Sequence, residues 1–468
     1  MALRPRGTDP SRPPFARRIA NLGAVTNLPR TLERIHRSPA AAARLDVAGH
    51  PVAYVRDLDT VRSVLDSRAP GIAERGRFFE DISRVIGTTS LVTCVGAEHR
   101  RLRRAVAPAF RPEQVAHYAS TMIAATDAQS GEWRDGERIV LGDAIGRLTL
   151  DIAARALLGL DGADQAEDFM TVLETGSRMF YRLALPRKIA DPLWRSSLSP
   201  ANRRLRAAQG RIDALVGRVL DERRGAGGPA VACPVSVPGG AARPQSLLDV
   251  LLEIRDADGA PLSPQELRDQ VVTFLFAGHE TTAQVLTWLF VELSLHPDVE
   301  DRLERELDSV VGARLPEPSD LERLAYARAV VRETLRLHPP AWFSSRETTA
   351  DTEIAGCPVP SGALIVVSPL ALQRDPAWWP DPLRFDPERW TGGRAVPPAY
   401  LPFGYGRRTC IGASFALAEA VAVVATVLST WHLRVDDPER VRARASVTLR
   451  TRRPVVARLE RRRPRATE

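Results

Sequence analysis

The sequence has almost no lysine. Of its 65 basic residues only Lys188 is a lysine, and with 57 acidic residues the net charge is +8. The arginines are spread along the chain and mixed with acids, whereas nucleic-acid-binding proteins concentrate basic residues in one tail or on one face. We therefore expect no nucleic-acid partner, although a local basic face would suit an acidic protein partner.

Cysteine is also scarce. The four cysteines, Cys94, Cys233, Cys357 and Cys410, lie far apart, with no CxxC pair and no zinc-finger spacing. This spacing argues against a disulfide framework and against a structural zinc site, and it fits a reducing compartment. Each cysteine must therefore be interpreted from its own surroundings.

Long hydrophobic runs are missing as well. The most apolar windows, 271–276 and 416–428, are too short or too interrupted by polar residues to cross a bilayer. Residues 1–30 are rich in proline and arginine and contain no signal-peptide core. We expect a soluble, cytoplasmic protein with no transmembrane segment.

The order of the sequence patterns favours one large domain. We expect an N-terminal arm over residues 1–40 and a single domain over residues 41–460, because the chain contains no internal repeat. The local patterns predict a hairpin near Val47–Val55, a helix capped by Asp57 or Asp59, mainly helices over 98–225 and a surface loop over 225–244.

A long helix is the clearest predicted element. Residues 263–266 (Ser-Pro-Gln-Glu) form a capping box with proline at the first helical position, and the apolar pattern then continues to Leu295. A helix of about 30 residues is about 45 Å long, enough to cross the whole molecule. Further helices are predicted over 320–337 and from Cys410 to Thr430, with a strand-like run at 363–368. The predicted fold is mainly α with small β-sheets around a long central helix.

The segment 403–412 carries the strongest chemical signal. It contains three glycines and places Cys410 directly before an alanine-rich helix. Glycine permits positive φ angles, and a helix N-terminus stabilises a thiolate through its dipole and free N–H groups. A lone cysteine is usually an inert, buried one. An unpaired thiolate in this glycine-rich loop would also be a reasonable metal ligand, and the segment has the pattern Phe403-x-x-Gly406-x-Arg408-x-Cys410-x-Gly412.

This pattern matches, at every fixed position, the haem-binding signature of the cytochrome P450 family. The chain resembles that family from about residue 40 to 455, least between roughly 160 and 245. The resemblance implies one large cytochrome P450-like domain that binds haem b, with the Cys410 thiolate as the axial ligand of the iron. It also implies that Phe403, Arg408 and Gly412 contribute to haem binding.

Two further motifs follow in the order that the resemblance implies. Glu333 and Arg336 lie three residues apart on one helix face, an arrangement that by itself is usually a solvated surface pair. The segment 385–390 (Phe-Asp-Pro-Glu-Arg-Trp) follows later and contains Arg389. The resemblance implies that Glu333, Arg336 and Arg389 form a buried structural triad that braces the thiolate loop.

The middle of the long helix contains Ala277-Gly278-His279-Glu280-Thr281-Thr282. Glycine and adjacent threonines are poor helix formers, so we predict a locally distorted turn. By resemblance, Ala277 lies at the haem, and Glu280 and Thr281 form the catalytic acid–threonine pair that relays protons during oxygen activation. The acid is glutamate here, where many bacterial members have aspartate.

The resemblance also implies cationic contacts to the cofactor. Four basic residues are expected to bind the haem propionates: His99 and Arg103, which share one helix face, Arg346 and Arg408. Taken alone, any one of them could equally be an ordinary surface charge. A second basic group is expected on the proximal surface, as a docking face for an acidic redox protein or as a merely solvated face: Arg100, Arg101, Arg104 and Arg407. We identify no flavin or ferredoxin module in the sequence, so electrons are expected from a separate ferredoxin and its reductase.

The substrate is expected to be a hydrophobic small molecule. Its contacts are predicted in residues 70–92, 170–200 and 341–344, and these segments and the long helix supply candidate pocket residues: Phe78, Phe79, Phe180, Phe274, Ala277, Trp342 and Phe343. Pro340-Ala341-Trp342 is similar to the corresponding segment of some bacterial terpene hydroxylases. We predict a monooxygenase that uses O2 to hydroxylate a terpenoid, fatty-acid or polyketide-like molecule.

Several alternatives share parts of this pattern. A haem-thiolate peroxygenase or an isomerase-like relative would keep Cys410, but peroxide users often lack the acid–threonine pair. A non-enzymatic haem carrier or sensor would have no use for a proton relay. A helical scaffold without a cofactor would leave the Cys410 loop unexplained.

Overall fold

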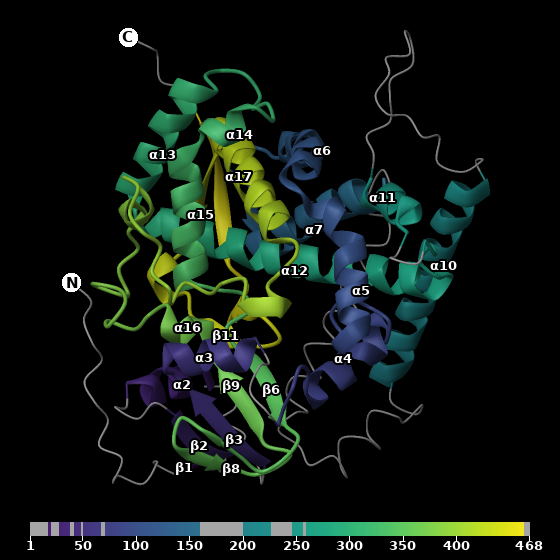
Figure 1. Cartoon of the computed structure of the whole chain (residues 1–468). Helices are drawn as coiled ribbons and strands as arrows, with labels where there is room; N and C mark the ends of the chain where they lie inside the picture. Colours follow the sequence, from purple (N-terminus) through teal and green to yellow (C-terminus); the bar gives the residue numbers. More distant parts are fainter. Residues whose placement is uncertain are drawn as a thin grey trace.

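The computed structural model describes residues 17–19, 28–37, 42–47, 50–66, 71–159, 200–225, 246–255 and 259–462. Helices make up most of this part of the chain, and the largest sheet lies at one end of the molecule (Figure 1). The predicted loop at 225–244 lies almost entirely outside the described residues.

The helices confirm most of the predicted helical segments. Asp57, not Asp59, caps α3, where its carboxylate accepts a hydrogen bond from the Thr60 amide. The α-helices are α2 (Leu28–His36), α3 (Leu58–Leu65), α4 (Arg77–Ile86), α5 (Gly96–Val106), α6 (Pro112–Gly131), α7 (Leu141–Ala153), α10 (Pro200–Gly225), α11 (Leu247–Glu253), α12 (Pro264–Leu295), α13 (Pro297–Val310), α14 (Asp320–Arg323), α15 (Ala325–Leu337), α16 (Pro369–Leu372) and α17 (Ala413–Thr430). A π-helical turn (Ala154–Leu158) follows α7, and short 3-10 turns cover Ala107–Phe110, Pro387–Trp390, Gly406–Arg408 and Pro438–Arg440.

Helix α12 is the predicted central helix. Its N-terminus has the expected capping box: the Glu266 amide donates to Ser263 Oγ at 3.2 Å, and the Ser263 amide donates to Glu266 Oε2 at 2.7 Å. Its 32 residues extend for about 48 Å, and the helix crosses the molecule beneath α15 and α17 (Figure 1). The helix is continuous through the turn predicted to be distorted, and Thr281 Oγ1 donates to the Ala277 carbonyl there.

The predicted helix over 320–337 is two helices. The chain breaks at Leu324, between α14 and α15, with φ −77° and ψ 71°. The start of α15 is capped from α13: the amides of Tyr326 and Ala327 donate to the two carboxylate oxygens of Glu306, at 2.6 and 2.8 Å. A contact from another helix therefore sets this boundary, and a helix-periodic pattern does not encode it.

The largest sheet has the strand order β1-β2-β3-β9-β6-β4. The predicted hairpin is β2 and β3, paired antiparallel with Val47 opposite His50, and the predicted strand at 363–368 is β9. The bounds in this sheet are β1 (Arg17–Ile19), β2 (Ala42–Val47), β3 (His50–Val55), β4 (Ile72–Ala73), β6 (Ser344–Thr348) and β9 (Leu364–Val367). The smaller sheets are β10-β13-β5 (Trp431–Val435, Val456–Arg461, Arg138–Val140), β11-β12 (Ala443–Ala445, Leu449–Thr451) and β7-β8 (Thr352–Ile354, Cys357–Val359).

Part of the segment predicted as an N-terminal arm is folded into the domain. Strand β1 pairs in parallel with β2, so that Arg17 lies opposite Leu45. Leu32 and Ile35 of α2 are buried in the core beside this sheet. The described residues before position 40 therefore contribute to the domain.

Helix α17 is long and strongly apolar. Among the described residues it is the one helix long and apolar enough to span a bilayer, by length and composition alone. However, 61% of that 18-residue window is buried inside the protein, where α17 packs against α6, α15 and α12. Its apolar character is accounted for by the core of the domain.

Candidate functional site

A cavity of about 430 Å³ lies between α12 and the loop that carries Cys410. Ala277, Gly278 and Thr281 of α12 line it, together with Cys410 itself. The remaining walls are mainly apolar and include Phe79, Leu91, Leu157, Phe274, Phe343 and Val447. The geometry therefore brings the two strongest sequence motifs, 133 residues apart at Ala277 and Cys410, to one space.

The Cys410 loop owes its shape to two glycines. Gly404 and Gly406 have φ angles of +76° and +71°, as the sequence predicted for this loop. A Cβ on Gly406 would lie 2.6 Å from Asp66 Oδ1, so no larger residue fits there. The Cys410 amide donates to the Phe403 carbonyl at 2.9 Å and closes the loop.

Cys410 is unpaired, and its side chain is exposed to the cavity it lines. Burial raises the pKa of its thiol, while the Gly412 amide and the positive charge of Arg103 lower it. Gly412 precedes the first turn of α17, so the sulfur lies at a helix N-terminus. These are the surroundings in which a metal ion would hold the sulfur as a thiolate.

Basic side chains gather beside this loop. Arg408, 5% exposed, donates to the Cys94 carbonyl at 2.8 Å and to Glu74 Oε2 at 2.6 Å. Arg103 donates to the Thr409 carbonyl at 2.8 Å. Burial, together with the positive charges of Arg408 and Arg103, lowers the pKa of His99 to about 4.

Two more arginines extend this group. Burial and the charge of Arg408 lower the pKa of Arg346 to about 10. Arg346 is buried next to the cavity-lining Ser345 and donates to the Leu65 carbonyl at 2.7 Å. Arg75 lines the cavity, its Nε has no hydrogen-bond partner, and burial lowers its pKa well below the ordinary value. From the sequence, Arg75 was expected only as part of the substrate-contact segment 70–92, and not as a member of this cationic group.

These cations are suited to an anionic ligand. Several described side chains shift the pKa values of His99, Arg75 and Arg346. Glu74 is the one acid among them that acts on all three. A surplus of buried positive charge around an apolar cavity is costly unless a bound anion compensates it. Gly278 adds room on the α12 side, since a Cβ there would meet no atom within 4 Å. The residues present therefore fit a flat apolar cofactor that bears carboxylates.

Only one residue of the predicted acid–threonine pair borders the cavity. Thr281 lines the cavity, with Oγ1 bonded to the Ala277 carbonyl at 2.6 Å. Glu280 is 6% exposed and is not among the cavity-lining residues. Its Oε1 accepts from Arg450, at 2.8 Å from Nε and 2.6 Å from Nη2, and from the Thr448 hydroxyl. The sequence did not indicate these partners.

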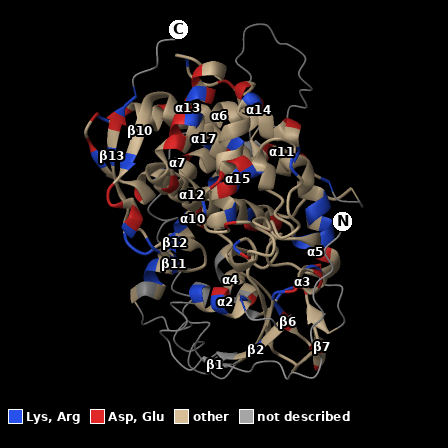
Figure 2. Ribbon diagram, turned by 90° about the vertical axis from the view of Figure 1, so that its left-hand side faces the viewer, with Lys and Arg blue, Asp and Glu red and all other residues tan. Residues whose placement is uncertain are grey.

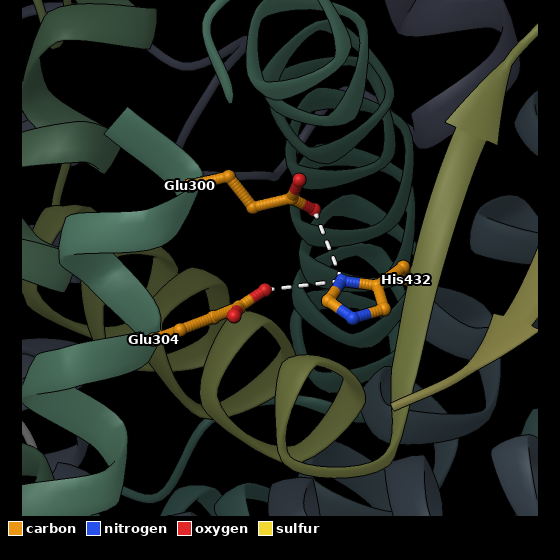
Figure 3. A group of neighbouring side chains, drawn as sticks. All are labelled: Glu300, Glu304 and His432. Carbon is orange, nitrogen blue, oxygen red and sulfur yellow. Dashed lines mark ion pairs between the residues drawn. The ribbon is translucent and has the colours of Figure 1, made fainter. Parts of the chain in front are cut away.

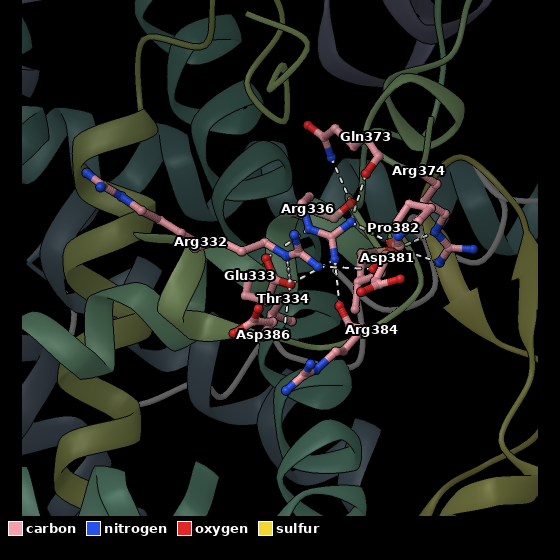
Figure 4. A network of polar contacts seen from close by, with 12 residues as sticks. Arg332, Glu333, Thr334, Arg336, Gln373, Arg374, Asp381, Pro382, Arg384 and Asp386 are labelled. Atoms are coloured by element: carbon pink, nitrogen blue, oxygen red, sulfur yellow. Dashed lines mark hydrogen bonds and ion pairs between the residues drawn. The ribbon is translucent and has the colours of Figure 1, made fainter. Parts of the chain in front are cut away.

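The predicted triad is present and fully buried at its centre. Glu333 and Arg336, both 0% exposed, form two bonds of 2.8 Å, and Arg389 Nε lies 3.3 Å from Glu333 Oε1. Arg336 also donates to the carbonyls of Gln373, Pro382 and Arg384, so that it ties α15 to the segment beneath it (Figure 4). The Leu401 amide donates to Gln373 Oε1 at 2.9 Å and extends the network toward the Cys410 loop.

Other predicted residues fall in different places. Phe79, Phe274 and Phe343 line the cavity, as do Phe403, Arg408 and Gly412. Trp342 does not: it is 0% exposed in the core, and its Nε1 donates to the Ser446 carbonyl at 2.9 Å. The prediction that Trp342 contacts the substrate is therefore wrong. Phe180, the rest of residues 170–199 and the side chain of Phe78 lie outside the described residues.

The predicted proximal basic face is smaller than expected. Arg100, Arg104 and Arg407 are exposed, and the basic residues of α5 can be followed in Figure 2. Arg101 is instead paired with Glu98 at 2.6 Å and with Glu266 of α12. Three exposed arginines therefore remain of the four predicted.

A cluster outside the cavity resembles a metal site in its composition. Glu300 and Glu304 of α13 face His432 of β10 (Figure 3). Arg434 pairs with Glu300, and Arg462 lies 3.7 Å from Glu304. His432 Nδ1 lies 3.0 Å from Glu304 and 3.6 Å from Glu300, and these two glutamates raise the pKa of His432 to about 9, so the imidazole holds a proton. The cluster is an ion-pair network that fastens β10 to α13, and sequence spacing alone gave no sign of it.

These features together define a haem-thiolate protein. A family model described as Cytochrome P450 matches residues 10–456, and the chain belongs to this family. It is accordingly a monooxygenase, an oxidoreductase whose cofactor is haem b held by a cysteine thiolate. Cytochrome P450 monooxygenases use O2 and act on hydrophobic substrates.

Similar proteins include two oxygenases from Streptomyces. Cyclooctat-9-en-7-ol 5-monooxygenase from Streptomyces melanosporofaciens is 37% identical over 84% of this chain and 81% of its own length. Pentalenene oxygenase from Streptomyces avermitilis is 34% identical over 81% of each chain. The crystal structure of the cytochrome P450DA haem domain superimposes with a TM-score of 0.80 at 26% identity and covers 95% of both chains.

Proposed function

We propose that this chain hydroxylates a cyclic terpenoid, with Cys410 as the axial ligand of the haem iron. The observation that carries the proposal is the shared cavity. Cys410, the carboxylate-binding cations and the acid–threonine helix all border one largely apolar space. A thiolate donates electron density that favours cleavage of the O–O bond, which is the chemistry that the bound haem supplies.

The cofactor contacts follow from the same geometry. Arg75, His99, Arg103 and Arg408 line the cavity and would bind the two propionates, with Arg346 beside them. Ala277 and Gly278 would face the flat side of the ring, and Phe403 and Gly412 would pack near the sulfur. Their role is to bind and orient, and the brace around Glu333 holds the loop in place.

The proton path is assigned to α12. The Thr281 hydroxyl borders the cavity and would donate a proton or orient water there. Glu280 would resupply that proton from the side of Arg450, which is 27% exposed and connects the buried carboxylate with the surface. Because Arg450 and Thr448 hold the same carboxylate oxygen, Glu280 has to rotate before it can deliver a proton inward.

The substrate class rests on two kinds of support. One wall of the cavity is apolar and is formed by Phe79, Leu157, Phe274, Phe343 and Val447. Relatives that are 37% and 34% identical over 84% and 81% of this chain are named for cyclooctat-9-en-7-ol and pentalenene, both terpenoids. A rigid cyclic hydrocarbon or its alcohol suits such a pocket, since burial of apolar surface supplies most of its affinity.

We further propose that electrons arrive from a separate ferredoxin and its reductase in the cytoplasm. Arg407 lies in the Cys410 loop, and Arg100 and Arg104 lie on α5, which contacts that loop through Arg103. An acidic partner would dock on these exposed charges. Docking through exposed charges weakens as salt is added. Electron transfer to the protein should therefore slow with ionic strength.

The first experiment tests the ligand. The reduced, carbon monoxide-treated protein should absorb well to the red of a histidine-ligated haem, and Cys410→Ser should abolish that band. The Cys357→Ser variant, which changes a buried cysteine outside the cavity lining, is the matched control and should keep it. A persistent shifted band in Cys410→Ser would falsify the ligand assignment.

The second experiment tests the substrate class. Cyclic terpenes and terpene alcohols, fatty acids and macrolide-like polyketides should be compared by the spin-state shift they cause in the haem. We expect terpenoids to bind most tightly, because the pocket described lacks a charged residue dedicated to a substrate carboxylate. Tighter binding of fatty acids would contradict this choice.

A further inference from the structure

Two fully buried polar residues of α12 are not used by the chemistry proposed above. Asp269 and Gln270 are both 0% exposed and lie about one helical turn before Thr273, the first cavity-lining residue of α12. Buried polar side chains need hydrogen-bond partners. Most of the partners of this pair belong to the loop formed by residues 87–95, which follows α4.

The contacts between this pair and the loop are direct and well formed. Asp269 Oδ2 accepts from the Thr89 amide at 3.0 Å and from the Thr89 hydroxyl at 2.7 Å. Gln270 Oε1 accepts from the Leu91 amide at 3.0 Å, and its Nε2 donates to the Thr89 carbonyl at 2.9 Å. Two adjacent side chains thus satisfy three backbone groups of the loop, in the way that a neighbouring strand would.

Close packing supports the same contact. Gly87 has a φ of +92°, and a Cβ placed on it would lie 2.0 Å from the Asp269 carboxylate carbon. The loop therefore approaches α12 as closely as a glycine allows. Asp269 is itself oriented by Gln265 and Arg268, which donate to Oδ1 at 2.8 Å each.

The loop forms a wall of the cavity. Leu91 and Val92 line the cavity, and Arg408 holds the far side of the loop by donating to the carbonyls of Leu91 and Cys94. The wall is thus fixed at two places, by α12 and by the Cys410 loop. Arg408 lies in the proposed cofactor site, whereas Asp269 and Gln270 lie outside the cavity lining.

We propose that Asp269 and Gln270 are positioning residues that clamp the 87–95 loop against α12 and thereby set which ligands reach the cavity and how fast they leave. The inference rests on the proposed function, because it takes the cavity as the ligand site above the haem. Breaking the clamp frees Leu91 and Val92 to move, which enlarges the opening for bulky ligands. Small ligands, which need no such movement, are unaffected.

Hydrogen exchange tests the clamp without any ligand. The variants are Asp269→Asn, which turns one acceptor into a donor, and Gln270→Leu, which removes both bonds. The control is Thr287→Val, since Thr287 is buried on the same helix but bonds only to the Ala283 carbonyl. The fragment spanning 87–92 should exchange about tenfold faster in both clamp variants and not in the control. Unchanged exchange in both clamp variants would overturn the proposal.

Ligand kinetics test the consequence. Imidazole and clotrimazole, a small and a bulky azole, are mixed with the haem-loaded protein, and binding is followed by the shift of the haem absorption band. Clotrimazole should associate about five- to tenfold faster in Asp269→Asn and Gln270→Leu, while the imidazole rate stays within about twofold. Equal changes for both azoles, or none for clotrimazole, would overturn the role in access. If imidazole caused no shift in the parent protein, the proposed function would fail, and hydrogen exchange would still decide on the clamp.

Discussion

Two regions of the molecule bury several charged side chains each, and they differ in how those charges are compensated. Around Glu333 the contacts form one network. Its carboxylate is bonded by Arg336, Arg389, the Trp390 indole and the Asp386 amide. Beside Cys410 four arginines and a histidine surround the cavity edge, and burial lowers the pKa values of His99, Arg75 and Arg346. The first region is completed by groups of the chain itself, whereas we propose that the carboxylates of a bound haem complete the second. Structural and functional charges can therefore be told apart by whether the protein itself supplies the counter-charge.

The largest effect should come from breaking the complete region. Glu333→Gln leaves Arg336 buried at 0% exposure without its carboxylate, and removal of one partner of a buried pair costs about 3–5 kcal/mol. Denaturant unfolding of the haem-loaded protein should show this loss. Glu322→Gln, at an exposed position on α14, is the control. A loss below about 1 kcal/mol would mean that solvent compensates the arginine.

A substitution in the region beside Cys410 should change the stability of the protein in opposite directions without and with haem. Arg75→Met removes a half-buried cation whose Nε is buried and has no hydrogen-bond partner. Without haem the substitution should leave stability unchanged or raise it by about 1 kcal/mol, and with haem it should lower stability by about 1–2 kcal/mol, because a propionate then loses its partner. Thermal unfolding with and without haem measures both. The same sign in both states would contradict the assignment of Arg75 to the cofactor.

Two histidines should extend the comparison to pH. His432 has its pKa raised to about 9, so its stabilising charge is fully present below pH 6.5 and is lost as the pH rises to 9. His99 has its pKa lowered to about 4, so its contribution is present above pH 6.5 and is lost as the pH falls to 4. His432→Gln should flatten the alkaline side of the stability curve by about 1–2 kcal/mol and leave the acid side unchanged. An alkaline side that stays as steep as in the parent would refute the ion-pair cluster.

The smallest effect should come from one bond of the complete network. Trp390→Phe removes the indole N–H that donates to Glu333 Oε2 at 2.9 Å and keeps most of the ring packing. We expect a loss of about 1–2 kcal/mol, since Arg336 still compensates the carboxylate. Urea unfolding is sensitive enough to detect it. A loss as large as that of Glu333→Gln would show that the network fails as a unit.

Local patterns predicted the parts of the fold whose signals are local. The capping box at Ser263 and the glycines at positions 404 and 406 act over a few residues, and the structure has them as predicted. The triad was predicted through a family resemblance, and its contacts are present. In each case the residues that specify the feature lie inside the motif that was recognised.

Features that depend on distant partners were missed. Glu306 divides the helix predicted over 320–337, from a position on α13. Trp342 was taken for a pocket residue, but its indole bonds to Ser446, a hundred residues further along the chain. Arg75 has no motif around it, and only the fold brings it next to Arg408 and Arg346. Aromatic and charged side chains have many suitable environments, and the tertiary structure selects one of them.

The contact between Gly406 and Asp66 has a consequence for the order of assembly. The metal-binding loop is among the last segments of the chain to be synthesised, yet its final shape requires a surface at the end of α3 that is made among the first. During synthesis the apolar chamber therefore stays open toward solvent until the last quarter of the polypeptide arrives. Haem can therefore be held by Cys410 only after this loop has been synthesised and has packed against the end of α3.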